Sequence, residues 1–177
     1  MTGVRERELV ELVAADGTPT GSATVDDAHR APGALHRAFS VLLVTPDGRT
    51  LLQRRAAVKT RFPSRWANSC CGHPLPGEAV TAAAGRRLGE ELGVTGVPLV
   101  EAGVYSYRAD DPATGRVEHE YDHVLVGRVA AELAVAPDPG EVAEVRWVRA
   151  AELRDEMARA ADAYAPWLPG VLSVVFS

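Results

Sequence analysis

The sequence is poor in cysteine, in lysine and in long apolar runs. Its 177 residues include 2 cysteines, Cys70 and Cys71, which are adjacent. Neighbouring cysteines make no disulfide framework, so we expect two free thiols in a reducing cytoplasm. The apolar run around Val41–Val44 falls far short of the roughly 20 residues of a membrane helix, and no apolar signal core follows Met1–Glu6. We therefore expect a cytoplasmic protein without a membrane-spanning segment.

The overall composition is that of an ordinary globular domain. Hydrophobic residues make up 46% of the chain, charged residues make up 24%, and the formal net charge is −5. These fractions exclude a disordered chain or a fibre. The acidic balance presents no basic face for nucleic acid. We expect one domain over residues 1–177, with its core at about residues 8–165.

Hydrophobic patterning predicts several strands and two helices. Apolar runs bounded by turn residues predict strands over residues 8–14, 38–45, 50–54, 97–107, 118–129 and 142–148. Helices are expected over residues 79–92 and 150–164, and residues 56–77 are expected to form an irregular loop because they are rich in Pro, Gly, Ser and Asn. Strands with one helix in the middle and another near the end indicate a mixed α/β sandwich.

The middle helix has a clear apolar face. Val80, Ala84, Leu88 and Leu92 recur every four residues and would line one buried side. Gly93 occupies the position just past the predicted end, where a left-handed backbone conformation favours glycine.

Charged residues on this helix also follow the helical spacing. Arg87 and Glu91, and likewise Arg86 and Glu90, lie four apart, and on a generic helix they would be surface ion pairs of little energetic weight. The whole span Gly72–Val94, however, resembles the Nudix box, a loop–helix–loop whose glutamates hold a divalent metal against a diphosphate. It departs at Arg87, where Nudix hydrolases carry a glutamate that helps to bind the metal that activates water. A cation there should damage hydrolysis and could bind a phosphate instead.

Five further residues could act as metal ligands, although each is a weak signal alone. They are His29, His36, His73, Glu118 and Glu120. The two glutamates alternate along a predicted strand, so both side chains point to one face of the sheet. None of the spacings is that of a zinc finger or of a helical histidine pair.

Taken together, several motifs resemble the type 1 isopentenyl-diphosphate isomerases, a family with the Nudix fold. The resemblance spans about residues 8–170 and rests on Leu35–Ser40, Asn68–Pro74, Tyr105–Ala109, Glu118–Glu120 and Pro166–Trp167. It implies a Nudix-type mixed-sheet α/β/α sandwich that moves a carbon–carbon double bond, converting isopentenyl diphosphate to dimethylallyl diphosphate through a tertiary carbocation, in isoprenoid biosynthesis.

The resemblance also implies two metal sites. One divalent ion would be bound by His29, His36, His73, Glu118 and Glu120. Three imidazoles and two carboxylates suit Zn²⁺, Mn²⁺ or Fe²⁺, and Mg²⁺ remains possible. A second ion, Mg²⁺, would be held by Glu91 and bridge to the substrate diphosphate.

The diphosphate itself would contact three cations. By the same resemblance these are Arg55, Lys59 and Arg87, with Arg suited to bidentate phosphate contacts and Lys acting as a point charge. Members of the family carry a basic residue four positions before the first metal histidine, where this chain has Val25. Either that contact is missing here, or Arg30 replaces it.

Proton transfer would fall to residues on opposite faces of the substrate. The resemblance implies that Cys71 and Glu120 handle the two protons, that Tyr107 hydrogen-bonds to Glu120, and that the ring of Trp167 covers the carbocation. Neighbouring side chains of an extended stretch point in opposite directions, so only one thiol should enter the pocket. The motif favours Cys71, which leaves Cys70 as a small buried side chain.

Other functions compete with the isomerase. A Nudix hydrolase of a nucleoside diphosphate derivative is the main alternative, and Arg87, Cys71 and the His/Glu set argue against it. A catalytically silent Nudix-like binding module would need a broken ligand set, and a simple zinc-binding protein fits least. We expect a monomer whose partner is a small diphosphate rather than nucleic acid or a membrane.

Overall fold

A computed structural model describes the backbone of residues 2–176 and the side chains of residues 4–176. The helices are α1 (Thr2–Arg5), α2 (Val25–Ala28), α3 (Val80–Leu92), α4 (Ala150–Arg159) and α5 (Leu168–Val175), with a 3-10 turn at Ala161–Ala163. The strands are β1 (Leu9–Val13), β2 (Pro19–Thr24), β3 (His36–Val44), β4 (Arg49–Arg55), β5 (Trp66–Ala67), β6 (Cys70–Gly72), β7 (Leu99–Asp110), β8 (Val117–Arg128) and β9 (Val142–Arg149).

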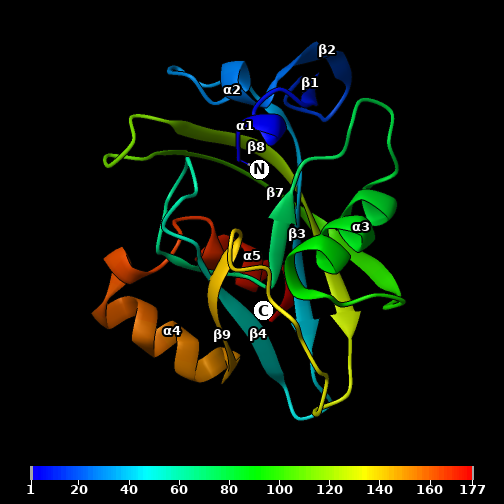
Figure 1. The fold of residues 1–177 in the computed structure, drawn as a ribbon, viewed down its shortest axis with the longest axis vertical. Coiled ribbons are helices and arrows are strands. Elements are labelled where there is room, and N and C mark those ends of the chain that lie inside the picture. The colour runs from blue at the N-terminus through cyan, green and yellow to red at the C-terminus, as the bar shows by residue number, and fades with distance from the viewer. Residues whose placement is uncertain (1, 177) are drawn as a thin grey trace.

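Strand β3 is the centre of the mixed sheet. Along one edge it pairs in parallel with β8 over its whole length, and β8 pairs antiparallel with β7. Along the other edge β3 pairs in turn with β1, β6 and β4, and β4 continues the sheet to β5 and β9. Residues from distant parts of the chain therefore meet around one end of β3 (Figure 1).

Helices cover both faces of the sheet. The side chains of Val41 and Leu43 pack with Leu51 beneath α3, whereas Leu42 and Leu52 point to the opposite face, toward α4 and α5. This alternation follows from the two-residue period of a strand, and it explains why central strands read as continuous apolar runs. Figure 1 shows α3 on one side of the strands and α4 on the other.

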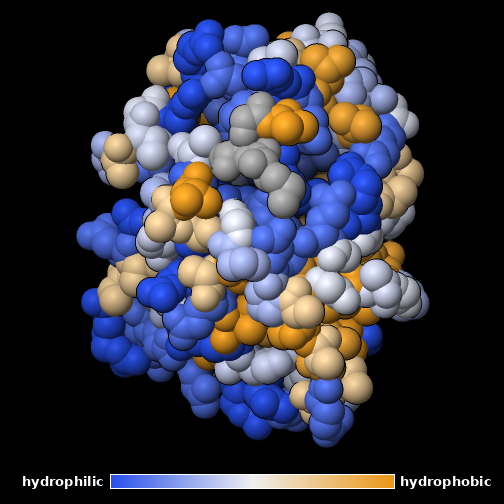
Figure 2. Space-filling view, viewed as in Figure 1, coloured by the Kyte–Doolittle hydropathy of each residue, from blue (hydrophilic) through white to orange (hydrophobic). Residues whose placement is uncertain are grey.

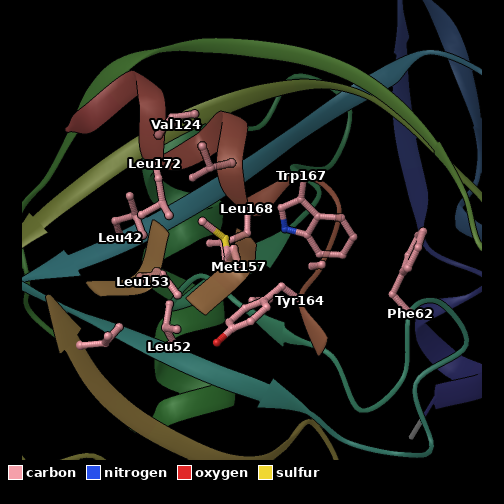
Figure 3. Close-up of a cluster of buried hydrophobic side chains, with 14 of the residues drawn as sticks. Leu42, Leu52, Phe62, Val124, Leu153, Met157, Tyr164, Trp167, Leu168 and Leu172 are labelled. Carbon is pink, nitrogen blue, oxygen red and sulfur yellow. The ribbon is translucent and has the colours of Figure 1, made fainter. Parts of the chain in front are cut away.

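The C-terminal segment completes the core on the α4 side. Trp167, Leu168 and Leu172 are almost fully buried and pack with Leu153 and Met157 (Figure 3). The packed core thus extends beyond the predicted limit near residue 165 into α5.

Two turn predictions are confirmed by backbone geometry. Gly93 adopts a left-handed conformation with φ of 66°, and its N–H donates to the carbonyl of Gly89, while Val94 N–H donates to Leu88. Asp47-Gly48 forms the hairpin turn from β3 to β4, with Gly48 at φ of 79°.

Several local predictions were wrong. Residues 56–77 contain the short strands β5 and β6, which form because they pair with β4 and β3. The second predicted helix ends at Arg159 rather than residue 164, and the chain continues through the 3-10 turn. The elements β2 and α2 are not predicted by the sequence, which has no clear apolar pattern there. β2 forms by pairing with β1, and α2 packs Val25 and Ala28 against Val10 of β1.

Gly170 on α5 offers a test of how tightly this helix packs. A Cβ at Gly170 would lie 2.0 Å from the Tyr105 ring on β7, whereas a Cβ at Gly85 on α3 would meet nothing within 4 Å. We expect Gly170→Ala to lower the free energy of unfolding by about 1–3 kcal/mol through overpacking. The control Gly85→Ala should raise it by about 0.5–1 kcal/mol, because alanine favours the helix. Urea unfolding measures both, and a Gly170→Ala protein as stable as the parent would contradict this packing.

Polar side chains cover most of the molecular face drawn in Figure 2, and its larger apolar area lies in the lower half of the view. Among residues 2–176, no helix combines the length and apolar character that crossing a bilayer requires.

Candidate active site

Three histidines from three separate elements converge at the end of β3. His29 directly follows α2, His36 opens β3, and His73 follows β6. Their ring centroids lie 4.6 to 5.1 Å apart. With Glu120 they offer ligand atoms that all lie within 4.8 Å of one another, so this group could hold a metal ion.

The surroundings of the histidines suit metal ligation. The Nδ1 atom of His29 lies 2.7 Å from the Val25 carbonyl oxygen, and Nδ1 of His36 lies 2.8 Å from that of Ala34. A carbonyl can only accept, so each Nδ1 carries the proton and Nε2 keeps a free lone pair. Nε2 of His36 is buried without a hydrogen-bond partner among the described residues. Such a buried acceptor is costly unless an ion occupies its lone pair, so the residues fit a divalent metal.

Glu120 sits in a row of side chains across three strands. On β8 it lies opposite His36 of β3 and opposite Tyr107 of β7. Its Oε1 atom is 3.0 Å from Nε2 of His73, and its Oε2 atom accepts a hydrogen bond from the Tyr107 hydroxyl at 2.7 Å. Cross-strand pairing therefore places the carboxylate between the histidines and the phenol.

Glu118 points to the same face but is less central. Its Oε2 atom is 3.0 Å from Nε2 of His29, and its Oε1 atom is 3.3 Å from the Arg61 guanidinium. It lies outside the tight group formed by the three histidines and Glu120. Arg61 therefore competes for one oxygen of this predicted ligand.

The protonation states in this cluster favour binding a cation. Burial lowers the pKa of His73 to about 4, so its imidazole is neutral at pH 7. Burial opposes ionisation of Glu120, but its polar contacts with His36 at 3.7 Å and His73 at 3.0 Å outweigh burial and hold the pKa of Glu120 well below its usual range. A neutral imidazole beside a carboxylate is the form that coordinates metals.

The two cysteines point in opposite directions, as expected for neighbours in a strand. Cys70 is fully buried under α3, whereas Cys71 faces a cavity, here called the histidine pocket, with His73, Tyr107, Glu120 and Trp167 in its lining. Burial, reinforced by the nearby Asp122 carboxylate, raises the pKa of Cys71 to about 12. Cys71 is therefore a neutral thiol at pH 7.

Asn68 connects the thiol to the aromatic wall of the pocket. Its Oδ1 atom accepts hydrogen bonds from Cys71 Sγ at 3.1 Å and from the Trp167 indole nitrogen at 3.0 Å. The ring centroids of Trp167 and Tyr107 lie 6.0 Å apart. The guanidinium carbon of Arg55 lies 5.5 Å from the Trp167 ring centroid. Asn68 thus fixes the orientation of both groups.

Basic side chains form the rim of the histidine pocket. Arg55, Lys59 and Arg87 all line it. The Arg55 guanidinium donates to the carbonyls of Arg61 and Phe62, which fixes its direction. Lys59 contacts Glu141, and Arg87 pairs with Glu90 at 2.5 Å. The three cations face one cavity, although they come from β4, the following loop and α3.

Glu91 lies beneath this basic rim. It is 2% exposed, accepts a hydrogen bond from Gln53 at 2.9 Å and pairs with Arg87. Burial opposes its ionisation, but Lys59 and Arg87 together lower its pKa. The Arg87–Glu91 pair is therefore buried, unlike the exposed pair of Arg86 and Glu90.

Comparisons with known proteins agree with the geometry. A family model described as the NUDIX domain matches residues 34–169. An isopentenyl-diphosphate Delta-isomerase from Nocardia farcinica is 60% identical over 165 residues, or 93% of each chain. A protein of the same name from Streptomyces griseus is 50% identical over 170 residues, 96% of this chain and 84% of its own.

The chain belongs to the isopentenyl-diphosphate Delta-isomerase family of Nudix proteins. Among solved structures, DR0079 from Deinococcus radiodurans has a TM-score of 0.76 at 20% identity and covers 96% of this chain and all of its own. A MutT protein from Methanosarcina mazei has a TM-score of 0.61 at 18% identity, covering 78% and 91%. At such identities the likeness concerns the fold alone. The predicted family and the Nudix-type sandwich are both confirmed.

Of the two alternatives at position 25, replacement by Arg30 is not supported. Arg30 is exposed, pairs with Asp26 and Asp27 of α2 and is absent from the lining of the histidine pocket. Val25 does line the pocket, so position 25 contributes no charge. Cations reach this wall from Arg5 and Arg61 instead.

Sequence reasoning missed other residues of the site. Asp122 continues the alternation of Glu118 and Glu120, and this period could have identified it. It is fully buried, and Ser40 donates a hydrogen bond to it at 2.7 Å. Burial, reinforced by the charge of Glu120, raises its pKa well above the usual range. Arg5 lies in no motif, and nothing in the sequence pointed to it.

Proposed function

We propose that this chain converts isopentenyl diphosphate to dimethylallyl diphosphate in isoprenoid biosynthesis. The observation that carries the proposal is the Cys71 thiol facing the same pocket as Glu120, Tyr107 and the histidine cluster. The names of the 50–60% identical relatives support it. Arg87 argues against hydrolysis, because it occupies the position at which Nudix hydrolases carry a metal-binding glutamate.

The proposed metal site uses His29, His36, His73, Glu118 and Glu120. The mixed nitrogen and oxygen donors suit Zn²⁺ or Mn²⁺, and Mg²⁺ is compatible with the carboxylates. When bound, the ion supplies positive charge that holds the Glu118 and Glu120 carboxylates in place. Glu118 would offer Oε2, which lies 3.0 Å from Nε2 of His29, while its Oε1 lies 3.3 Å from the Arg61 guanidinium.

The diphosphate binds to the basic rim. Arg55, Lys59 and Arg87 line one side of the pocket and supply charge-assisted hydrogen bonds to its oxygens. Glu91 would hold a Mg²⁺ ion, which would supply positive charge to the diphosphate. Because Arg87 and Lys59 already neutralise Glu91, diphosphate binding rearranges a charge cluster that is present beforehand.

Cys71 and Glu120 handle the two protons. One group adds a proton to the terminal alkene carbon, and the other removes a proton from the carbon that becomes part of the new double bond. Tyr107 donates its hydrogen bond to Glu120 and orients that carboxyl group. The raised pKa keeps the Cys71 thiol protonated, so it is able to donate a proton.

Trp167 shields the carbocation between the two proton transfers. Its ring is 2% exposed and stands beside Tyr107, so the aromatic wall excludes water that would trap the cation as an alcohol. A ring face attracts a cation by up to about 2 kcal/mol when both are desolvated. The Arg55 guanidinium carbon lies 5.5 Å from the centroid of the same ring, so the aromatic wall adjoins the cations proposed to bind the diphosphate.

The function is tested by proton NMR of the protein with isopentenyl diphosphate and Mg²⁺ in D₂O. We expect dimethylallyl diphosphate to appear with deuterium incorporated, because addition and removal of protons exchange with solvent. Release of inorganic phosphate without isomerisation would contradict the proposal and support a Nudix hydrolase. No reaction by metal-loaded protein would contradict it as well.

We further propose that the chain works as a single-domain monomer in the cytoplasm. One sheet connects elements from β1 to β9, and the helices of the C-terminal segment pack on that sheet, which supports a single domain. The two cysteines are free, which accords with a reducing compartment.

A further inference from the structure

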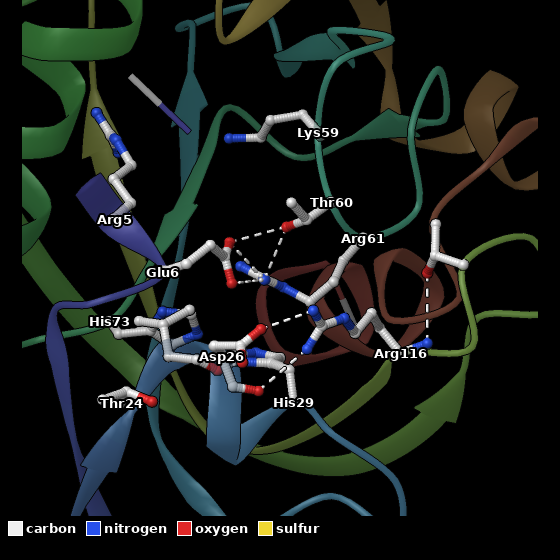
Figure 4. Close-up of polar contacts among 12 residues, drawn as sticks. Arg5, Glu6, Thr24, Asp26, His29, Lys59, Thr60, Arg61, His73 and Arg116 are labelled. Carbon is white, nitrogen blue, oxygen red and sulfur yellow. Dashed lines mark hydrogen bonds and ion pairs between the residues drawn. The ribbon is translucent and has the colours of Figure 1, made fainter. Parts of the chain in front are cut away.

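The N-terminal segment forms one wall of the histidine pocket. Arg5, Glu8 and Leu9 line the cavity together with Lys59 and Arg87. Figure 4 shows Arg5 and Lys59 on the same side of the Glu6 carboxylate, with the histidines on the other side. A segment with no recognisable motif therefore reaches the part of the pocket that faces the diphosphate.

This segment is anchored to the rest of the fold by the residues that directly follow Arg5. The carboxylate of Glu6 accepts hydrogen bonds from the Thr60 hydroxyl and from the Arg61 guanidinium, each at 2.9 Å. The backbone carbonyls of Glu6 and Glu8 accept hydrogen bonds from the first N–H groups of α2 at 3.0 and 2.9 Å. Arg5 is thus carried by backbone that is already ordered, which reduces the entropic cost of using it for binding.

Arg5 belongs to a cluster in which one carboxylate forms ion pairs with several cations. Its Nε atom lies 3.0 Å from Glu141, whose carboxylate also contacts Lys59 and lies 3.6 Å from Arg87. Glu141 is only 7% exposed, so water screens these charges poorly. Glu90 and Glu91 also pair with members of this group, and among residues 4–176 Glu141 is the one carboxylate that contacts all three cations.

A diphosphate offers these three cations more anionic oxygens than the Glu141 carboxylate that they share. A diphosphate carries several anionic oxygens, and a guanidinium can donate two parallel hydrogen bonds to two of them. A guanidinium can pair in the same way with a carboxylate such as Glu141, so the two anions can replace one another. The second partner of Arg5, Glu90 at 3.2 Å, has a side chain that is 41% exposed and is easily released to water. Val25 adds no charge to the pocket, whereas Arg5 adds a cation to its lining.

We propose that Arg5 is a diphosphate-binding residue, delivered by the N-terminal segment, which exchanges Glu141 and Glu90 for the substrate's phosphate oxygens. The inference rests on the proposed function for the identity of the substrate. The anion site itself does not depend on isomerisation and can be probed with inorganic pyrophosphate.

The test compares Arg5→Ala with Arg7→Ala. Arg7 has the same charge and lies two residues away, but it is exposed and outside the pocket lining. Calorimetric titration with pyrophosphate and Mg²⁺ gives Kd, and NMR initial rates give KM and kcat for isopentenyl diphosphate. We expect Arg5→Ala to raise Kd and KM by about tenfold with little change in kcat, because one charge-assisted contact is lost. Arg7→Ala should match the parent, and Arg5→Lys should recover part of the affinity.

The outcomes separate this inference from the proposed function. If the parent isomerises and Arg5→Ala binds pyrophosphate and substrate as Arg7→Ala does, Arg5 is not a binding residue. If the parent does not isomerise but Arg5→Ala loses pyrophosphate affinity, the anion site stands and the proposed function falls.

A second comparison excludes an indirect effect through Glu141. If Arg5 acted only by drawing Glu141 away from Lys59 and Arg87, its removal would have no effect in a Glu141→Gln background. We expect Arg5→Ala to raise the pyrophosphate Kd in that background as well. Equal affinities of Glu141→Gln and the double variant would overturn direct contact.

Discussion

Replacing Cys71 with alanine is expected to lower kcat by at least about a thousandfold while the fold stays intact. A positioned acid or base contributes about 10²- to 10⁴-fold to a rate, and an alkene is so weak a base that the upper part of this range applies. The pKa of about 12 keeps the thiol neutral at pH 7, so alanine removes a proton-transfer group without removing a charge. The measurement is the initial rate of dimethylallyl diphosphate formation, with circular dichroism to confirm folding.

Cys70→Ala is the matched control for this prediction. Cys70 is the same residue type one position away, but it is buried in the apolar core under α3 and does not line the histidine pocket. We expect that variant to retain kcat and to lose only some stability, because a small side chain leaves a small cavity. A Cys71→Ala protein within a few-fold of the parent would remove the thiol from the mechanism.

Removing the metal from the parent protein is expected to abolish isomerisation until metal is added back. His36→Ala should stay inactive even with added metal. Nε2 of His36 is buried with no hydrogen-bond partner among the described residues, so we expect an ion to occupy its lone pair. An ion at a hundred times its dissociation constant stabilises the folded state by about 2.7 kcal/mol. The parent's melting temperature should therefore rise on adding Zn²⁺ or Mn²⁺ after chelation, and that of His36→Ala should not.

His123→Ala provides the control for metal loss. His123 lies on β8 as Glu120 does, but it faces away from the histidine pocket and pairs with Glu101. Elemental analysis should find the parent's ion content in His123→Ala and a clear deficit in His36→Ala. Equal content in both variants would contradict the proposed ligand set.

Sequence reasoning predicted well where a short stretch carries its own pattern. The apolar period from Ala84 to Leu92 identified α3, and the alternation of Glu118 and Glu120 identified a shared face, because both depend only on backbone period. The motif around Cys71 identified the member of the cysteine pair that faces the pocket. These features are local, and packing did not override them.

The remaining features depend on contacts between distant segments. Strand β6 exists because residues 70–72 pair with β3, and its own composition does not favour a strand. Arg61 turned out to be an ion-pair partner of Glu118, and Arg5 a part of the pocket wall, since both positions are set by tertiary contacts. A run of basic residues in a sequence shows that positive charge is present, but not which groups those side chains contact in the folded protein.

The parallel register between β3 and β8 has a consequence for how the protein folds. His36 lies directly opposite Glu120 across these strands, which are far apart in the chain. A shift by one residue would turn one of the two side chains to the wrong face and destroy the ligand set. Such long-range parallel pairing is intrinsically slow. During refolding in the presence of Co²⁺, the visible absorbance of the bound ion should therefore appear only after β3 and β8 have paired in register. The rate at which this absorbance appears would then report the rate of strand pairing.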